Sequence, residues 1–188
     1  CMELFIGVAY DRKFQIDSNI KVKFVNTGHM LGSGTAWIEI KENGSVTRIA
    51  YTGDIGRPEN RILKSPQPFP QCDYLITEST YGNRLHPQLQ EAEGELLRVI
   101  RETCVDRGGK LIIPSFAIGR TQEVVYALNN FFNEGLLPKV NIYVDSPLAV
   151  NATDIFRVHS DILNEDVATT MLTDPDPFGF NSLYYIKS

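Results

Sequence analysis

Two loops of the sequence each offer one side chain that could bind a metal ion. His29 lies in the glycine-rich stretch 26–34, and Asp54 follows Gly53 in the stretch 53–58. Both stretches come directly after runs that are typical of β-strands. Imidazole nitrogen and carboxylate oxygen bind zinc at about 2.0–2.2 Å, and a carboxylate can bridge two ions. The alternatives are local: a histidine beside glycines is common in turns, and an aspartate often caps a turn.

A third acidic side chain, Glu78, follows the strand-like run 74–77. Ligands of open α/β sheets bind at the carboxyl ends of strands, so Glu78 is a candidate for the same site. Its alternative is a helix N-cap or a solvated turn.

Two later loops lead into predicted helices and are candidates for phosphate binding. Ser115 and Arg120 lie in the stretch 114–120, and Ser146 lies between Asp145 and a proline. Helix N-terminal amides can hold a phosphate, and a guanidinium adds charged donors. The alternatives are an ion pair between Arg120 and Glu123, and a simple N-cap role for Ser146. No GxGxxG or GxxxxGK[ST] motif is present, so nucleotide binding is poorly supported.

The other histidines and the cysteines do not suggest a metal site. His86 precedes a proline at a predicted helix start and His159 ends a predicted helix, so we expect both to be structural or solvated. The three cysteines are widely spaced, with no CxxC pair. We expect them to be small buried hydrophobic residues in a reducing compartment, the cytoplasm. They are Cys1, Cys72 and Cys104.

The elements that position these residues change character near residues 80–86. Before this point short β-type runs dominate, and Asn43-Gly44 predicts a hairpin turn between two of them. After it, strands and helices alternate, which predicts right-handed crossovers and a parallel sheet. We expect strands at 22–25, 35–40, 48–51 and 74–77, buried strands at 110–113 and 140–144, a strand-like run at 183–186, and helices at 87–106, 121–133 and 148–159.

Composition sets limits on the function. The chain has 188 residues and a net charge of −5, which excludes a wholly basic nucleic-acid-binding surface but leaves room for a local basic strip. The apolar stretch 4–10 is far shorter than the roughly 18 residues of a membrane span, and no basic segment precedes it. Because the chain opens at Cys1 and stops after a strand-like run, we expect an interior fragment of a longer protein.

Taken in order, the loops resemble motifs of the metallo-β-lactamase superfamily, and specifically of its β-CASP nuclease branch. The resemblance is strongest to the RNA-processing group, which includes the pre-mRNA 3′-end cleavage nuclease and its bacterial and archaeal homologues. The stretches that carry it are TGHMLGS at 27–33, YTGD at 51–54, ESTYG at 78–82, IPSFAIGRTQE at 113–123 and VDSPLA at 144–149.

The resemblance implies an α/β fold class: part of an αββα metallo-β-lactamase domain in residues 1–82, then the first part of a Rossmann-like β-CASP domain with a parallel sheet in residues 83–188. It further implies that His29 binds one zinc ion, that Asp54 bridges two, and that Glu78 orients active-site histidines. Single-stranded RNA would run between the domains, with Ser115, Arg120 and Ser146 as substrate contacts.

The family's upstream His-x-His-x-Asp-His loop and its two later motif histidines have no counterpart here. The expectation is therefore a zinc-dependent RNA phosphodiesterase, endonuclease or 5′–3′ exonuclease, in which this fragment alone is inactive. The alternatives are a catalytically dead β-CASP scaffold or RNA-binding subunit, a DNA-directed nuclease of the same superfamily, and a small-molecule-binding α/β domain. No membrane association is expected, and a homodimer of the whole protein stays open.

Overall fold

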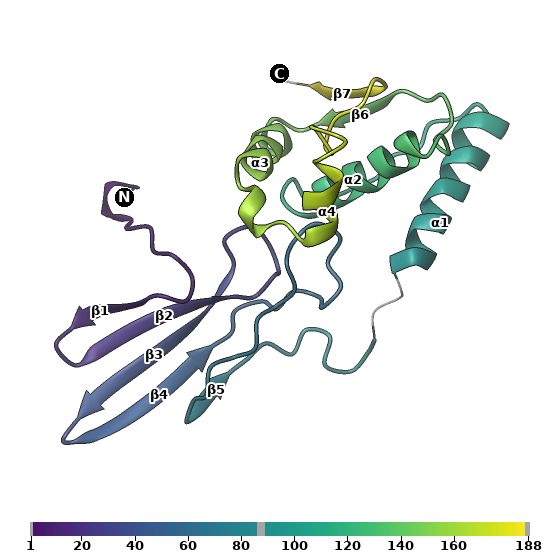
Figure 1. Ribbon diagram of the computed structural model, residues 1–188. Coiled ribbons are helices and arrows are strands. Elements are labelled where there is room, and N and C mark those ends of the chain that lie inside the picture. Colours follow the sequence, from purple (N-terminus) through teal and green to yellow (C-terminus); the bar gives the residue numbers. More distant parts are fainter. Residues whose placement is uncertain (1, 86–88, 187–188) are drawn as a thin grey trace. The chain divides into compact units, whose positions relative to one another are not determined.

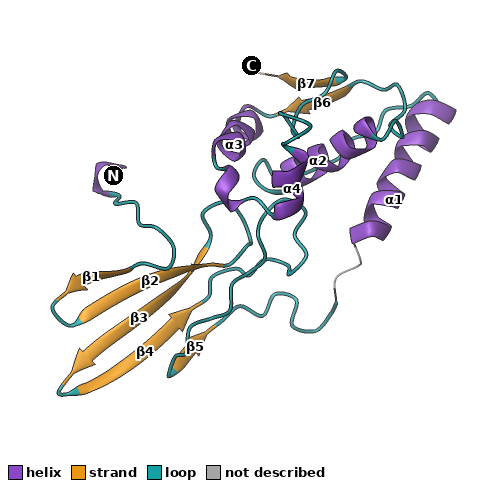
Figure 2. Ribbon diagram, in the orientation of Figure 1, coloured by secondary structure: helices purple, strands orange, loops and turns teal. Residues whose placement is uncertain are grey.

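The computed structural model describes residues 2–85 and 89–186, and the chain divides into two compact units (Figure 1). The first unit is Cys1–Thr80 and the second is Tyr81–Ser188; each is described by itself. Helices and strands are both present and both sheets contain a parallel pair, which confirms the predicted α/β class (Figure 2). His86 and Cys1 lie outside the described residues. Among the described helices, none is both long and apolar enough to cross a membrane.

The first unit is built on one five-stranded sheet in the order β1-β2-β3-β4-β5. The first four strands form an antiparallel meander, and β5 pairs with β4 in parallel. The predicted turn at Asn43-Gly44 is present, and both residues have positive φ, as a two-residue hairpin turn requires. The elements are a 3₁₀ turn Met2–Leu4, β1 Lys13–Asp17, β2 Ile20–Asn26, β3 Gly34–Glu42, β4 Ser45–Tyr51 and β5 Tyr74–Ile76.

This topology places three loops at one edge of the sheet. Both β2 and β4 run antiparallel to β3, so they run parallel to each other, and β5 runs the same way. The carboxyl ends of β2, β4 and β5 therefore meet at the same edge. His29 follows β2, Asp54 follows β4 and Glu78 follows β5.

Buried apolar side chains lie on both faces of this sheet, because Val22 points away from the face that holds Val25, Trp37 and Ala50. Trp37 from β3 is buried, and its indole Nε1 donates to the carbonyl oxygen of Gln71 at 3.1 Å. Ile62 and Leu63, in the connection between β4 and β5, are also buried, so this long connection is anchored by its own apolar side chains. The remaining buried hydrophobic residues of the sheet are Val22, Val25 and Ala50.

The second unit alternates helices with two strands that pair in parallel, β6 with β7. Its helix α1 continues into a π-helical turn, so the predicted helix 87–106 is present from residue 89 onward. The cluster of Ile100, Leu128 and Phe131 packs α1 against α2. The elements are α1 Leu89–Ile100, the π turn Arg101–Asp106, α2 Arg120–Asn133, β6 Ile142–Asp145, α3 Pro147–Val158, a 3₁₀ turn Ser160–Ile162, α4 Glu165–Thr170 and β7 Leu183–Ile186.

Two predictions for the second unit are wrong. Residues 110–113 form no strand, and Ile112 is 86% exposed rather than buried. A strand needs a neighbour for its backbone N–H and C=O groups, and in the described part of this unit β6 pairs only with β7. The strand expected at 140–144 is β6, but only Val144 is buried in it, because one face of the β6–β7 pair is open.

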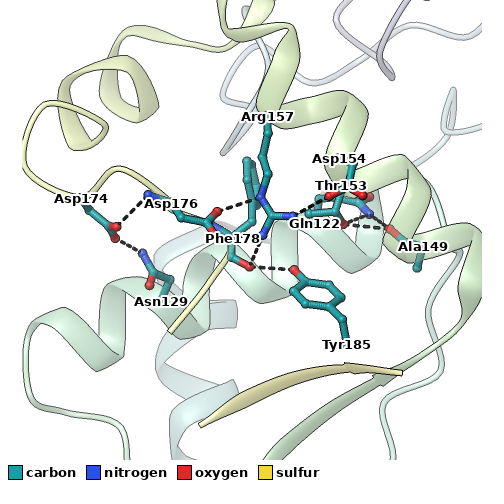
Figure 3. Close-up of polar contacts among 10 residues, drawn as sticks. All are labelled: Gln122, Asn129, Ala149, Thr153, Asp154, Arg157, Asp174, Asp176, Phe178 and Tyr185. Atoms are coloured by element: carbon teal, nitrogen blue, oxygen red, sulfur yellow. Dashed lines mark hydrogen bonds and ion pairs between the residues drawn. The ribbon is translucent and has the colours of Figure 1, made fainter. Parts of the chain in front are cut away.

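A polar cluster holds the segment before β7 against α3 (Figure 3). The guanidinium of Arg157 donates through Nε and Nη2 to the two carboxylate oxygens of Asp176, at 2.9 and 2.8 Å. Tyr185 in β7 donates its hydroxyl to the carbonyl oxygen of Phe178 at 2.7 Å, and burial raises the pKa of this tyrosine. These contacts connect the segment before β7 to α3 and to β7 itself, and β7 pairs with β6 through the backbone.

Candidate functional site

His29 and Asp54 converge at the edge of the first sheet where β2 and β4 end. The Nε2 atom of His29 lies 3.7 Å from Oδ2 of Asp54, and both side chains are partly open to solvent, 38% and 68% exposed. Two ligands on one tetrahedral zinc ion, each at about 2.1 Å, lie about 3.4 Å apart. The spacing and the donor types therefore fit two neighbouring ligands of a shared ion.

The loop that carries His29 is organised by Ser33. Its hydroxyl oxygen accepts hydrogen bonds from the backbone N–H groups of His29 and Met30, both at 3.1 Å. The hydroxyl of Thr27, which is buried, donates to the same oxygen at 2.9 Å. Sequence reasoning treated this serine only as part of a motif. Ser33 lies four residues after His29, and serine side chains commonly accept hydrogen bonds from nearby backbone amides, so this spacing could have indicated its role.

Two glycines allow the His29 and Asp54 loops to touch. The backbone N–H of Gly56 donates to the carbonyl oxygen of Thr27 at 2.8 Å. A Cβ atom on Gly56 would overlap the carbonyl group of Gly28 and lie 2.7 Å from the backbone nitrogen of His29. Gly28 itself has a φ of +61°, which favours glycine. The close approach of the two loops therefore depends on the missing side chain at Gly56.

Glu78 joins the same edge through the backbone next to Asp54. Its Oε1 accepts the N–H of Ile55 at 2.7 Å. The hydrogen bond from Ile55, and a second from the Thr80 hydroxyl, lower the pKa of Glu78, and the nearby His29 adds to the effect. Glu78 is therefore ionised at neutral pH and fixes the start of the loop that follows Asp54.

The described residues supply two candidate metal ligands, not a complete set. No group of three or more histidine, cysteine, aspartate or glutamate side chains in residues 2–85 and 89–186 could hold a metal ion. His159 is exposed at the end of α3. Cys72 and Cys104 are free and half-buried, not fully buried as expected.

The three candidate substrate residues lie in the second unit, and each has a partner within it. Arg120 pairs with Glu123 at 3.1 Å and keeps 53% of its side chain exposed. The hydroxyl of Ser115 lies 2.8 Å from that of Thr121. The hydroxyl of Ser146 accepts the N–H of Ala149 at 3.2 Å, ahead of a proline in the first turn of α3. The alternatives stated for Arg120 and Ser146 are thus both present.

The start of α2 does not offer the free amides expected for a phosphate. The N–H of Gly119 donates to Oε1 of Gln122 at 2.8 Å. The N–H groups of Arg120 and Thr121 donate to the carbonyl oxygens of Ile118 and Phe116, at 3.2 and 3.3 Å. The tight turn at Gly119, with a φ of +85°, brings these groups together. These three N–H groups are therefore not free to hold a phosphate.

Sequence reasoning missed Gln122, which is fully buried and connects this loop to α3 (Figure 3). Its Nε2 lies 3.0 Å from the hydroxyl of Thr153 and 3.3 Å from the carbonyl oxygen of Ala149, both in α3. The same nitrogen donates to the carbonyl oxygen of Ala117 in the loop at 3.1 Å. A buried amide with this many partners fixes the loop that contains Ser115 and Arg120.

Comparisons with known proteins show which families the chain resembles. The family model described as the Beta-Casp domain matches residues 121–188. An RNase J-like protein of Methanocaldococcus jannaschii is 39% identical over 181 residues, which cover 95% of this chain and 42% of the relative. Transcription termination factor FttA of the same organism is 37% identical over 182 residues, covering 95% of this chain and 28% of the relative.

Endoribonuclease ysh1 of Schizosaccharomyces pombe is 34% identical over 189 residues, covering 96% of this chain and 24% of the relative. The chain thus spans less than half the length of each of these three relatives, while nearly all of it takes part in each alignment. Given the Beta-Casp match, the similarity to RNA-processing proteins and the ordered motifs, the chain is similar to the β-CASP family of the metallo-β-lactamase superfamily.

Proposed function

We propose that this chain is part of a zinc-dependent RNA phosphodiesterase. The observation that carries the proposal is the convergence of His29 and Asp54, 3.7 Å apart, at one edge of a sheet. It is supported by similarity to proteins named RNase J-like protein and endoribonuclease. The substrate that we propose is single-stranded RNA, and the free cysteines fit a cytoplasmic location.

Each residue at the sheet edge has a distinct role in this proposal. His29 would hold one zinc ion and Asp54 would bridge two. When bound, zinc supplies Lewis acidity, which polarises a phosphoryl oxygen and lowers the pKa of water. Glu78 holds the N–H of Ile55 and thereby keeps Asp54 directed toward His29. The Ser33 hydroxyl holds the backbone of His29 from the other side.

The second unit would contribute RNA contacts. Arg120 is engaged with Glu123 on one side only, and its exposed guanidinium can still face a phosphate. Ser115 and Ser146 lie on the two loops that Gln122 connects to each other through α3. We propose that residues 1–82 are part of a metallo-β-lactamase domain and that residues 83–188 are part of a β-CASP domain.

We further propose that residues 1–188 alone do not cleave RNA. A catalytic zinc ion takes three protein ligands, and the described residues bring together only two candidates. The whole protein would provide the remaining ligands. This part of the proposal also accounts for why the candidate site is so open to solvent.

Replacement of Asp54 by asparagine in the whole protein tests the proposal. Asp54→Asn is expected to lower RNA cleavage by at least about a hundredfold, since the amide keeps the shape but loses the bridging charge. Bound zinc should fall in parallel, measured by metal analysis. The melting temperature should change little because Asp54 is exposed. Glu42→Gln is the matched control, because Glu42 is an exposed carboxylate at the end of β3 that lies away from the His29 loop. Full cleavage by the Asp54 variant would refute the proposal.

A second candidate function is transcription termination, favoured by 37% identity to a factor with that name over 95% of this chain. A termination assay with the Asp54→Asn protein separates the two. Termination that survives the loss of cleavage would show that RNA binding, as in a scaffold subunit, is sufficient for that role.

A further inference from the structure

The loop before α2 presents an aromatic ring to solvent while its backbone is held. The side chain of Phe116 is 85% exposed. Its carbonyl oxygen accepts two hydrogen bonds from Thr121, one from the hydroxyl at 2.8 Å and one from the backbone N–H at 3.3 Å. The exposed ring is therefore attached to a backbone that is held in place.

The rest of the loop is equally constrained. Buried Gln122 binds the carbonyl oxygen of Ala117 and the N–H of Gly119, so both ends of the segment after Phe116 are anchored. Burying a phenylalanine side chain stabilises a fold, and this loop lacks that contribution although a buried amide holds its backbone. A loop with this arrangement is organised to present the ring.

A charge close to Phe116 in the sequence indicates what the ring contacts. Arg120 lies four residues after Phe116 in the sequence, at the first position of α2, with just over half of its side chain exposed. An exposed aromatic face together with a cation is the combination that binds single-stranded nucleic acid, since the base stacks and the phosphate pairs. A purely apolar protein contact would not require the neighbouring guanidinium.

We propose that Phe116 is a stacking platform for a base of single-stranded RNA, with Arg120 directed to an adjacent phosphate. This inference rests on the proposed function, because it names the contact through which the second unit binds the substrate. It adds a residue that supplies affinity for bases without selecting among them, because every base has a face that can stack.

Binding of a fluorescein-labelled 12-nucleotide oligoadenylate, followed by fluorescence anisotropy, tests the proposal. The whole protein is used in the Asp54→Asn background, so that the RNA is not cut. Phe116→Ala is expected to weaken binding about tenfold, whereas Phe116→Tyr keeps the ring and stays within about twofold. Leu172→Ala is the matched control, because Leu172 is an equally exposed apolar side chain of the second unit.

A 12-nucleotide abasic ribose-phosphate oligomer separates stacking from a structural effect. The Phe116→Ala defect should vanish with this oligomer, because no base is left to stack. An equal loss with both oligomers would overturn the proposal, as would unchanged binding. A shift in sedimentation without a change in RNA binding would assign the ring to a protein contact instead. If the parent protein binds neither oligomer, the proposal that the second unit binds RNA is refuted, and the stacking role of Phe116 is refuted with it. If the parent protein binds normally and the Phe116→Ala variant binds equally well, only the stacking role is refuted.

Discussion

Replacing Gly56 by alanine is the sharpest test of how the candidate metal site is assembled. A Cβ at this position would overlap the carbonyl group of Gly28 and approach the backbone nitrogen of His29 to 2.7 Å. These are backbone atoms, so no side-chain rotation can relieve the overlap. The two loops must separate, and the hydrogen bond from the Gly56 N–H to Thr27, now 2.8 Å long, must lengthen or break.

The expected cost follows from these two losses. Overpacking of this kind costs about 1–3 kcal/mol, and the hydrogen bond contributes about 1 kcal/mol. The free energy of unfolding of the Gly56→Ala variant should therefore fall by about 2–4 kcal/mol. For a chain of this length, that corresponds to a fall in melting temperature of about 4–16 °C.

Thermal unfolding followed by circular dichroism measures this change, with Gly7→Ala as the matched control. Gly7 has no atom within 4 Å of an added Cβ, so the control reports the general effect of a glycine-to-alanine exchange. NMR of the His29 ring reports the local site, and its signals should move in the Gly56 variant alone. If the Gly56 variant melts within 1 °C of the control, the two loops do not touch as described.

Two further predictions concern the polar contacts. Native hydrogen bonds lower the pKa of Glu78, so the ionised carboxylate stabilises the folded state. This stabilisation is fully present above the pKa of Glu78 in the unfolded chain. It is lost as the pH falls through the lower pKa of Glu78 in the folded chain. The melting-temperature difference between wild type and Glu78→Gln, measured from pH 7 to pH 3, should therefore shrink below about pH 4.3; a constant difference would contradict this. Gln122→Met keeps the side-chain volume but leaves the Gly119 N–H and the Ala117 carbonyl without their partner. The free energy of unfolding, measured with urea, should therefore fall by about 2–4 kcal/mol. An unchanged free energy of unfolding would refute the anchoring role of Gln122.

The main features of the first unit could be predicted from sequence because they depend on local signals. The positive φ values at Asn43 and Gly44 follow from residue type, and the strand-like runs around them predict the hairpin of β3 and β4. The strand β1 was not predicted. Once β2, β4 and β5 are in place, the convergence of the loops with His29, Asp54 and Glu78 follows from the direction of the strands. Their roles as ligands and positioning residues stay predictions.

Features that depend on distant partners could not be predicted in this way. The run at 110–113 has strand composition, but whether it pairs depends on a neighbouring strand, which composition does not report. Gln122 is a polar residue on a predicted helix, and its burial arises only because α3 packs over it. The contact between Gly28 and Gly56 joins two loops separated by a hairpin, so no local pattern encodes it.

The pairing of β5 with β4 has a consequence for the order in which the first unit folds. The strands β1 to β4 are joined by short turns and loops, so their pairings close small loops and form early. The parallel pairing of β5 must wait until the long connection 52–73, which carries Asp54, has closed. Glu78 lies beyond β5, so the Asp54 side of the candidate site is completed last. An ion held by His29 and Asp54 would therefore stabilise the completed unit, by joining a loop of the early meander to the connection that closes last.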